Sequence, residues 1–294
     1  MKLHENEFEM DENTVHKLVK SQCPQFLKGD LKKFSSSGTE NFMFTLGDDK
    51  LVRLPRTIDA VVSLEKEAKC LPILGREMTM PIPRVVFEGK PSETYPFPWL
   101  VLSKLEGREV FAMNPLDTQM ASKKLADFIL NLRSISVAGA PKTARGMPLL
   151  LRDNAVKKSL PLLSDDYDLK LLEKLWEDSL GAALWSLDPL WLHGDLHEGN
   201  ILVKEKELSA VLDFGLCGVG DPSCDLMAAW TLLDYESRRE FFSLLKADSD
   251  SIRKARGWAL SMGILGYPYY KNTNPSFAHM VKKVIDEIIK DPLL

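Results

Sequence analysis

The chain has 294 residues, which is enough for one large domain or two small ones, each able to bury a hydrophobic core. Its 38 basic and 42 acidic residues give a net charge of −4. A dedicated nucleic-acid-binding protein usually carries a basic excess, so we expect no nucleic-acid partner. With 45% hydrophobic and 27% charged residues, the composition excludes a chain that is mostly disordered, collagen-like or coiled-coil.

Targeting signals and cysteine usage indicate a cytoplasmic protein. The N-terminus does not show the basic and apolar pattern of a signal peptide. The uncharged stretch at 257–270 is too short, and too interrupted by glycine and proline, to span a bilayer. The four cysteines form no C-x-x-C pair, so we expect buried thiols in a reducing compartment. We therefore expect no membrane partner. We expect the protein to be a monomer or a dimer.

The first hundred residues predict a mainly antiparallel sheet of about five strands with one internal helix. An amphipathic pattern at 11–28 predicts a first helix that ends at Pro24. A second helix is expected at 60–74. The strand patterns lie near residue 34 and at 42–46, 51–54, 85–87 and 99–102.

The remainder of the chain is mostly helical, with one compact β-rich stretch at 191–214. The texture changes at 103–107, so we predict an N-terminal lobe over 1–103 and a larger helical lobe over 104–294. The fold class is therefore α+β. Helices are expected at about 117–135, 166–180, 223–234, 236–246, 252–264 and 276–290.

The β-rich stretch contains polar residues that a buried hairpin must compensate. Apolar runs at 201–203 and 210–212 flank a charged turn and predict that hairpin. Asp195, Asn200 and Asp213 lie at its strand ends, where unpaired carboxylates and amides would be costly. A hard divalent cation with oxygen ligands and space for phosphate oxygens would compensate them, and Mg²⁺ fits that description.

A carboxylate beside such an ion can accept a proton from a substrate hydroxyl. Each polar residue alone could instead cap a turn. However, the pattern H-x-D-x-x-x-x-N over 193–200, followed by D-F-G at 213–215, has the spacing of the catalytic and metal-binding loops of protein kinases. The joint pattern favours phosphoryl transfer. A zinc site at His193 and His197 is disfavoured. Two histidines at this spacing bring their rings together only on a helix, and this pair lies in a loop.

The sequence resembles the aminoglycoside phosphotransferase family, within the group that includes choline kinases and macrolide kinases. The motifs at 193–200, 213–215 and 220–226 carry the resemblance. Gly194 stands where protein kinases have arginine, and G-D-P-x-x-D-L replaces their A-P-E segment. The order of elements agrees along nearly the whole chain.

This resemblance implies a bilobal, protein-kinase-like fold and the transfer of phosphate from ATP or GTP to a hydroxyl of a small molecule. It implies Asp195 as the catalytic base, with Asn200 and Asp213 as Mg²⁺ ligands. An aminoglycoside or a similar antibiotic is one candidate acceptor.

The nucleotide is expected to bind the first lobe. The loop at 35–41 has one glycine rather than the three of G-x-G-x-x-G, but its small side chains allow backbone N–H groups to approach phosphate. A plain hairpin turn is the alternative, and the position of the loop in the lobe favours nucleotide binding. The candidate nucleotide-binding residues of this loop are Ser37, Gly38, Thr39 and Asn41.

Arg53 is the expected phosphate-holding cation, on the third strand, in place of the lysine usual in kinases. Its acidic partner is expected on the next helix, where Glu65 and Glu67 both qualify and Glu67 is preferred because it is nearer the middle. A solvated helix face is the alternative for this glutamate. The strand at 98–103 should join the lobes, with its backbone on the purine at Leu100 and Leu102.

The acceptor is less well indicated. Seven acids and two bases between Asp165 and Asp188 could form a wall for a polycation, or simply the solvated face of a helix. A non-catalytic kinase-like module and a protein kinase stay open as alternative functions. The intact motif residues argue against the first, and the missing A-P-E segment argues against the second. Aromatic residues that could stack on an acceptor, or belong to the core, are Trp258, Tyr267, Tyr269 and Tyr270.

Overall fold

The computed structural model describes the chain except for residues 1–7, 9, 35–39, 111–115 and 292–294. The predicted nucleotide-loop residues Ser37, Gly38 and Thr39 therefore lie outside the described residues. Among the described residues, no helix combines the length and the apolar character that crossing a membrane requires.

The first part of the chain forms a five-stranded antiparallel sheet, as the sequence predicts. The strand order is β1-β2-β3-β5-β4. A helix, α1 (Glu12–Gln22), precedes the sheet, and the Asp11 side chain caps it by accepting a hydrogen bond from the Thr14 N–H at 2.7 Å. The strands are β1 (Leu31–Lys33), β2 (Asn41–Leu46), β3 (Lys50–Pro55), β4 (Val85–Gly89) and β5 (Trp99–Ser103).

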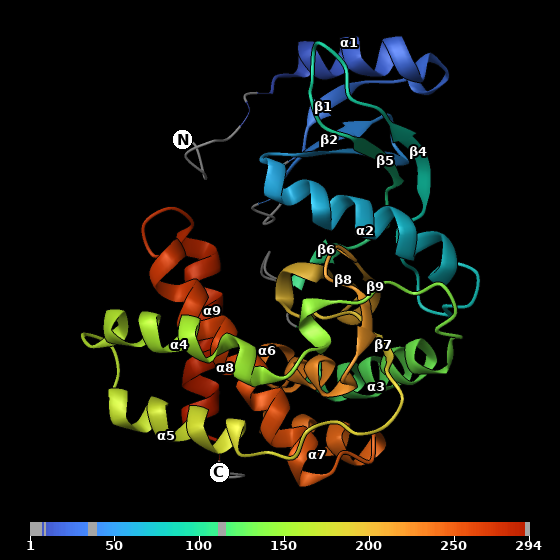
Figure 1. Cartoon of the computed structure of the whole chain (residues 1–294). Coiled ribbons are helices and arrows are strands. Elements are labelled where there is room, and N and C mark those ends of the chain that lie inside the picture. The colour runs from blue at the N-terminus through green and yellow to red at the C-terminus, as the bar shows by residue number, and fades with distance from the viewer. Residues whose placement is uncertain (1–7, 9, 35–39, 111–115, 292–294) are drawn as a thin grey trace.

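The helix α2 (Ile58–Leu74) lies between this sheet and the second half of the chain (Figure 1). Thr57 caps its first turn, and it buries Leu64, Glu67 and Cys70. A buried glutamate on a helix that is otherwise buried through apolar residues is unusual and requires a partner.

The second half is mainly helical, with two small sheets of order β6-β8-β9 and β10-β7. Its helices are α3 (Thr118–Ser134), α4 (Asp153–Ser159), α5 (Leu169–Leu180), α6 (Ala228–Leu232), α7 (Tyr235–Leu244), α8 (Ser249–Tyr270) and α9 (Pro275–Ile289). Its strands are β6 (Arg108–Glu109), β7 (Leu190–Leu192), β8 (Ile201–Lys204), β9 (Glu207–Val211) and β10 (Gly218–Gly220). The expected α+β architecture is confirmed.

Two local predictions need correction. The sequence did not indicate α4, because this short helix buries only Val156 and so shows no apolar period. The helix expected at 223–234 is a 3₁₀ segment, Pro222–Met227, followed by α6. The Asp225 carboxylate in that segment accepts two hydrogen bonds from the loop at 193–194, so tertiary contacts rather than helix propensity set its path.

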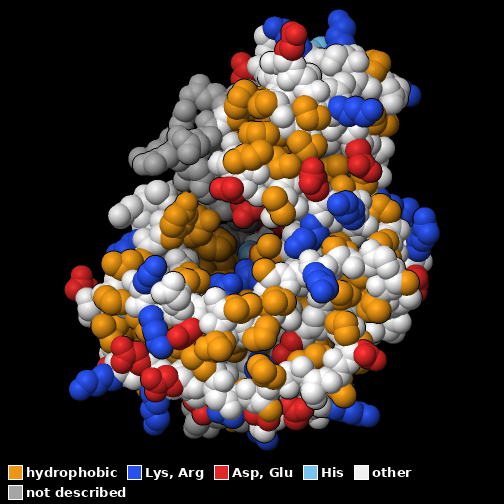
Figure 2. Space-filling model, viewed as in Figure 1, with side chains coloured by type: hydrophobic (Ala, Val, Ile, Leu, Met, Phe, Trp, Pro, Cys, Tyr) orange, Lys and Arg blue, Asp and Glu red, His pale blue; other side chains and the backbone are white. Residues whose placement is uncertain are grey.

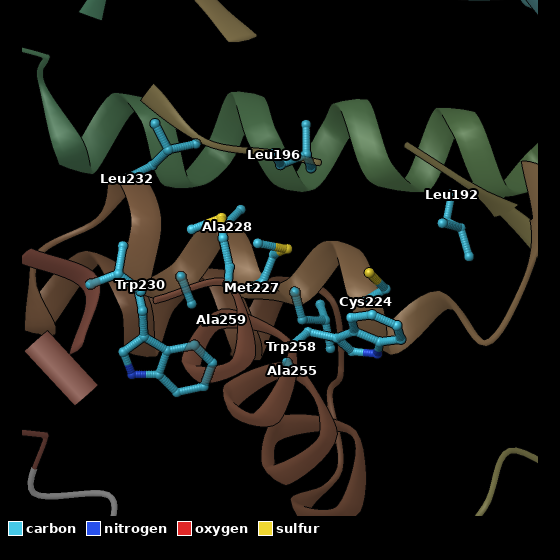
Figure 3. Close-up of a cluster of buried hydrophobic side chains, with 14 of the residues drawn as sticks. Leu192, Leu196, Cys224, Met227, Ala228, Trp230, Leu232, Ala255, Trp258 and Ala259 are labelled. Atoms are coloured by element: carbon cyan, nitrogen blue, oxygen red, sulfur yellow. The ribbon is translucent and has the colours of Figure 1, made fainter. Parts of the chain in front are cut away.

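The hydrophobic side chains form two clusters, and β5 contributes to both. Trp99 and Val101 face a cluster confined to the first part of the chain, whereas Leu100 and Leu102 face the main cluster. Figure 3 shows a portion of the main cluster around Trp258. Because β5 and α2 join the main cluster to the sheet, the two halves share apolar contacts, and the lobe boundary at residue 103 stays a prediction.

Candidate active site

The β8–β9 hairpin places two predicted metal ligands at one end. Asn200 immediately precedes β8 and Asp213 follows β9, and the Leu212 N–H donates to the Asn200 carbonyl oxygen at 2.8 Å. Asp213 has a φ of 60°, in the left-handed region that aspartate tolerates better than most residues. The hairpin therefore brings the two side chains to the same edge by local geometry alone.

The catalytic-loop candidate Asp195 follows β7 and is held by buried hydrogen bonds. The N–H groups of His193 and Gly194 donate to the Asp225 carboxylate at 2.8 and 2.7 Å. The fully buried His193 ring accepts from the Asp195 N–H at 3.2 Å through Nδ1, while its Nε2 lies 2.9 Å from the Leu212 carbonyl oxygen. His193 thus braces the loop.

Three side chains contact the Asp195 carboxylate. His197 Nε2 lies 3.3 Å and Asn200 Nδ2 lies 3.2 Å from Oδ2, and Arg145 Nη2 donates to Oδ1 at 3.0 Å. Burial by itself would raise the pKa of Asp195, but the charges of His197 and Arg145 outweigh it and hold that pKa well below its usual range. Asp195 is therefore an ionised carboxylate at neutral pH, able to accept a proton.

Arg53 forms a second ionic cluster next to this loop. Its Nη1 lies 3.0 Å from Glu67 Oε2, and its Nη2 donates to Asp213 Oδ1 at 2.9 Å. Glu67 also accepts a hydrogen bond from the Phe214 N–H at 3.1 Å. The partner of Arg53 on α2 is Glu67, whereas Glu65 is exposed.

The charges in this cluster shift one another's pKa values. Burial raises the pKa of Glu67, and the Asp213 carboxylate adds to the rise while Arg53 opposes it. Burial alone would lower the pKa of Arg53, but the charges of Asp213 and Glu67 hold it above its ordinary value. Two carboxylates thus compete for one guanidinium.

Two further predicted nucleotide residues lie against Arg53, and one predicted contact needs correction. The Asn41 amide oxygen, when turned toward Arg53, lies 3.2 Å from Nε and 3.1 Å from Nη2. Leu100 is the cross-strand neighbour of Arg53. However, β5 lies between β3 and β4, so its backbone groups at Leu100 and Leu102 are paired with strands on both sides. The Ser103 N–H donates to the Arg84 carbonyl oxygen at 2.9 Å and the Lys104 N–H donates to the Asp49 carbonyl oxygen at 2.8 Å, so backbone pairing continues to the end of the strand.

The residues at the end of the hairpin fit Mg²⁺. Asn200 uses its Nδ2 for Asp195 and Asp213 uses its Oδ1 for Arg53. Within the described residues, no hydrogen bond reaches Asn200 Oδ1 or Asp213 Oδ2. Hard cations prefer oxygen ligands of this kind. No group of three or more His, Cys, Asp or Glu side chains that could hold a metal exists in the described parts of the chain, so the remaining ligands would come from phosphate oxygens and water.

Sequence reasoning missed Arg145, which lies 50 residues before Asp195 in the chain. The only local signal was Gly194. Its φ is 83°, and a Cβ there would lie 2.9 Å from Arg145 Cβ, so a side chain at this position would displace Arg145. The absence of a side chain beside the base makes room for a cation from elsewhere.

Comparison with known proteins agrees with this geometry. The model of the phosphotransferase enzyme family matches residues 30–258. Wild-type aminoglycoside 2'-phosphotransferase-IIIa in its GDP complex is similar, with 20% identity and a TM-score of 0.70 over 95% of this chain and 99% of the other. The GDP and kanamycin complex of APH(2″)-IIIa gives 21% identity and a TM-score of 0.72 over 93% and 97%.

A macrolide 2'-phosphotransferase from Brachybacterium faecium shares 18% identity, with a TM-score of 0.61 over 91% of this chain and 97% of that one. Among curated proteins, no sequence matches the chain. The fold is thus that of the kinase-like antibiotic phosphotransferases. Since the family model covers most of the length, the chain belongs to the phosphotransferase enzyme family.

Proposed function

We propose that this protein transfers the γ-phosphoryl group of ATP or GTP to a hydroxyl of a small molecule. The observation that carries the proposal is the ionised Asp195 carboxylate held beside Asn200, at the hairpin end that also presents Asp213. A proton acceptor next to two oxygen ligands is the arrangement that kinases use for phosphoryl transfer.

In the proposed reaction, Asp195 accepts the proton of the acceptor hydroxyl. The acceptor oxygen forms a bond to the γ-phosphorus as the bond to the β,γ-bridging oxygen breaks, and the nucleoside diphosphate leaves with that electron pair. Asn200 and Asp213 hold Mg²⁺, which when bound neutralises charge on the phosphate oxygens. His197 and Arg145 keep Asp195 ionised and oriented.

Arg53 is the proposed phosphate ligand. Its nitrogens already face Asn41, Glu67 and Asp213, so nucleotide binding requires an exchange of partners. With the metal and nucleotide bound, Asp213 would hold Mg²⁺ and Arg53 would donate from Nη2 to a phosphate oxygen. Ser37, Gly38 and Thr39 remain proposed phosphate contacts, and the side chains of Leu100 and Leu102 are proposed to line the purine site.

Aminoglycosides and macrolides are candidate acceptors, because structural neighbours were solved with kanamycin, gentamicin or streptomycin or act on macrolides. The acidic residues near α5 give a polycation little support. Asp166 pairs with Lys271 and Lys282 at 3.2 Å each, and Asp178 pairs with Arg253 and Arg256. Their charge is compensated within the protein.

The test is Mg²⁺-dependent consumption of ATP and GTP in the presence of aminoglycosides, macrolides, amino alcohols and sugars, with Asp195→Asn as the variant. The substitution keeps the shape and removes the proton acceptor. We expect kcat to fall by about 10²-fold or more, with nucleotide binding near that of the wild type. Normal turnover by Asp195→Asn on its true acceptor would remove Asp195 from the reaction, and absence of turnover with every acceptor would favour a non-catalytic module.

A further inference from the structure

Two arginines from the segment before α4 lie over one aromatic ring, and one of them pairs with the base. Arg145 belongs to a 3₁₀ turn, Ala144–Gly146, and Arg152 ends a second one, Leu149–Arg152. Both guanidinium carbons lie over the ring of the buried Trp258, at 5.8 and 5.1 Å from its centroid. Trp258 is therefore a core residue that holds the two cations near each other, and Arg145 rather than the ring contacts Asp195.

The first of these turns is rigidly attached to the segment after Asp213. The Thr143 hydroxyl donates to the Leu216 carbonyl oxygen at 2.6 Å, and the Asp221 N–H donates to the Gly146 carbonyl oxygen at 3.0 Å. Gly146 and Gly220 are in close backbone contact, since a Cβ on Gly220 would lie 2.5 Å from Gly146 Cα. This tight packing fixes where Arg145 enters the site.

Arg152 is a half-buried cation with no counter-charge of its own. Within the described part of the chain, no hydrogen bond or ion pair reaches its guanidinium, and its Nε is buried without a partner. Arg145 Nη1 is also buried without one. Burial and the like charge of Arg145 lower the pKa of Arg152 to about 10. Such a pair of cations is costly in the free protein unless something else neutralises it.

The neighbouring carboxylates are committed elsewhere. Asp153, next to Arg152 in the chain, accepts from Lys157 at 2.8 Å and from the Trp176 indole at 2.9 Å. Asp221 pairs with Lys254 at 2.8 Å, and both oxygens of Asp225 accept backbone N–H groups. Asp195 pairs with Arg145 at 3.0 Å, and the proposed reaction needs that carboxylate as a base.

One face of the molecule is hollowed. Figure 2 shows a depression near its middle, with Lys, Arg and His side chains low in it, hydrophobic side chains beside it and Asp or Glu side chains above it. One aromatic row leads toward the base, with ring centroids 4.8 Å apart for Tyr270 and Phe277 and 5.8 Å apart for Phe277 and His197. An acceptor would meet an apolar side and a basic floor.

We propose that the acceptor carries an oxyanion, a carboxylate or a phosphate, which Arg145 and Arg152 bind beside the hydroxyl that Asp195 deprotonates. The inference rests on the proposed phosphotransferase function and narrows its substrate class. Guanidinium groups bind both oxyanions through paired N–H donors. The reaction is unchanged: the hydroxyl proton goes to Asp195, the hydroxyl oxygen takes the γ-phosphoryl group, and the anion stays bound. A polycationic acceptor would meet two like charges here.

The experiment compares matched acceptors that differ in the anion. Glycerate is paired with glycerol, and ribose 5-phosphate with ribose, so that the carboxylate and phosphate arms are separate; kanamycin is the polycation. Binding is measured by calorimetry without nucleotide, and kcat/KM by Mg²⁺-dependent nucleotide consumption. We expect the anionic member of at least one pair to bind about 10-fold or more tightly than its neutral partner, and to react with a correspondingly higher kcat/KM where it is an acceptor.

The variants are Arg152→Gln and Arg152→Lys, with Arg239→Gln on the exposed side of α7 as a matched control. Arg152→Gln should weaken binding of the anion by at least about 10-fold, and its effect on KM should be larger than its effect on kcat. Arg152→Lys should restore part of that affinity. Because Arg152 has no hydrogen bond or ion pair to lose in the described part of the chain, and its contact with the Trp258 ring is offset by relief of its like charge with Arg145, Arg152→Gln should fold with a Tm close to that of the wild type. Arg239→Gln should change each value by less than about twofold.

The outcomes separate this inference from the function on which it rests. Anion binding that depends on Arg152 without any turnover would support the oxyanion site and count against the phosphotransferase function. Turnover that prefers glycerol, ribose or kanamycin, or that ignores Arg152→Gln, would overturn the oxyanion site and leave the phosphotransferase function standing. Failure of every anionic probe to bind in an Arg152-dependent way would also overturn the oxyanion site.

Discussion

The two ionic clusters beside the catalytic loop use the same residue type with opposite balance. On the sheet side, one guanidinium, Arg53, is shared by the carboxylates of Glu67 and Asp213. On the helical side, one carboxylate, Asp195, pairs with Arg145, and the charge of Arg145 also acts on Arg152, which has no ion pair of its own in the described part of the chain. The first cluster has a carboxylate in excess, and the second has a cation in excess.

This difference indicates what each side is built to receive. Buried like charges are costly unless a ligand or a counter-ion compensates them. An excess carboxylate suits Mg²⁺ and its nucleotide, whereas an excess guanidinium suits an oxyanion on the acceptor. The sign of the uncompensated charge, rather than the presence of arginine, therefore distinguishes the nucleotide side from the acceptor side.

Asp213→Ala removes the excess carboxylate and should have the largest effect. Wild-type protein at about 100 times the Kd of Mg²⁺–ATP gains about 2.7 kcal/mol of stability, because the ligand binds only the native state. We expect the variant to lose most of the Mg²⁺-dependent rise in Tm, since Asn200 is then the one proposed protein ligand left for the ion. Thermal unfolding with ATP, with and without Mg²⁺, measures it. An unchanged rise would remove Asp213 from the metal site.

Gly194→Ala tests how the acceptor-side cluster is assembled. The alanine would have to keep the φ of 83° found at Gly194. Its Cβ would lie 2.9 Å from both Arg145 Cβ and the Leu216 carbonyl oxygen. We expect a loss of about 2 kcal/mol in the free energy of unfolding, together with lower kcat. Gly139→Ala is the control, because Gly139 has a φ of 77° with no atom within 4 Å of the added Cβ.

Gly139→Ala introduces a similar backbone strain without the steric clash. It should therefore lower the free energy of unfolding by less than Gly194→Ala does, and it should leave kcat unchanged. Chemical denaturation and nucleotide consumption supply the two measurements. Equal losses of stability in Gly194→Ala and Gly139→Ala, with normal kcat in both, would show that Arg145 does not depend on the missing side chain at Gly194.

Arg53→Lys tests whether the sheet side needs a planar fork or only a charge. Arg53 faces three groups at once, and a single ammonium cannot reproduce that geometry. We expect the KM for nucleotide to rise about 10-fold, which corresponds to the loss of a charge-assisted hydrogen bond. Steady-state kinetics with ATP and GTP measure it. Wild-type KM in Arg53→Lys would mean that positive charge alone suffices.

Lys50→Ala should have the smallest effect and is the charge-removal control for β3. The Lys50 side chain is 22% exposed, pairs with Asp49 at 2.7 Å and lies 5.7 Å from the centre of the Phe26 ring. These contacts are remote from Asp213, so the nucleotide KM should stay within about twofold. If Lys50→Ala raises KM while Arg53→Ala does not, Lys50 rather than Arg53 is the phosphate ligand.

The sequence by itself determined the order of the elements and the local geometry of the catalytic loop. Strands and helices were predicted from short-range periodicity, and the hairpin necessarily places Asn200 and Asp213 at one end. Arg53 and Glu67, which are 14 residues apart, are predicted as partners because they lie on a strand and on the helix that follows it. Such relations follow from backbone geometry over a few turns or strand residues.

Only the tertiary structure decided how distant segments meet. The position of β5 between β3 and β4 shows that its backbone is already paired, and the ion pairs of Asp166 and Asp178 show that part of the acidic stretch is compensated within the protein. Arg145 reaches Asp195 across 50 residues because glycine contacts and buried hydrogen bonds fix the turn that carries it. Periodicity holds no information about such contacts, since they depend on the packing of side chains from elements far apart in the chain.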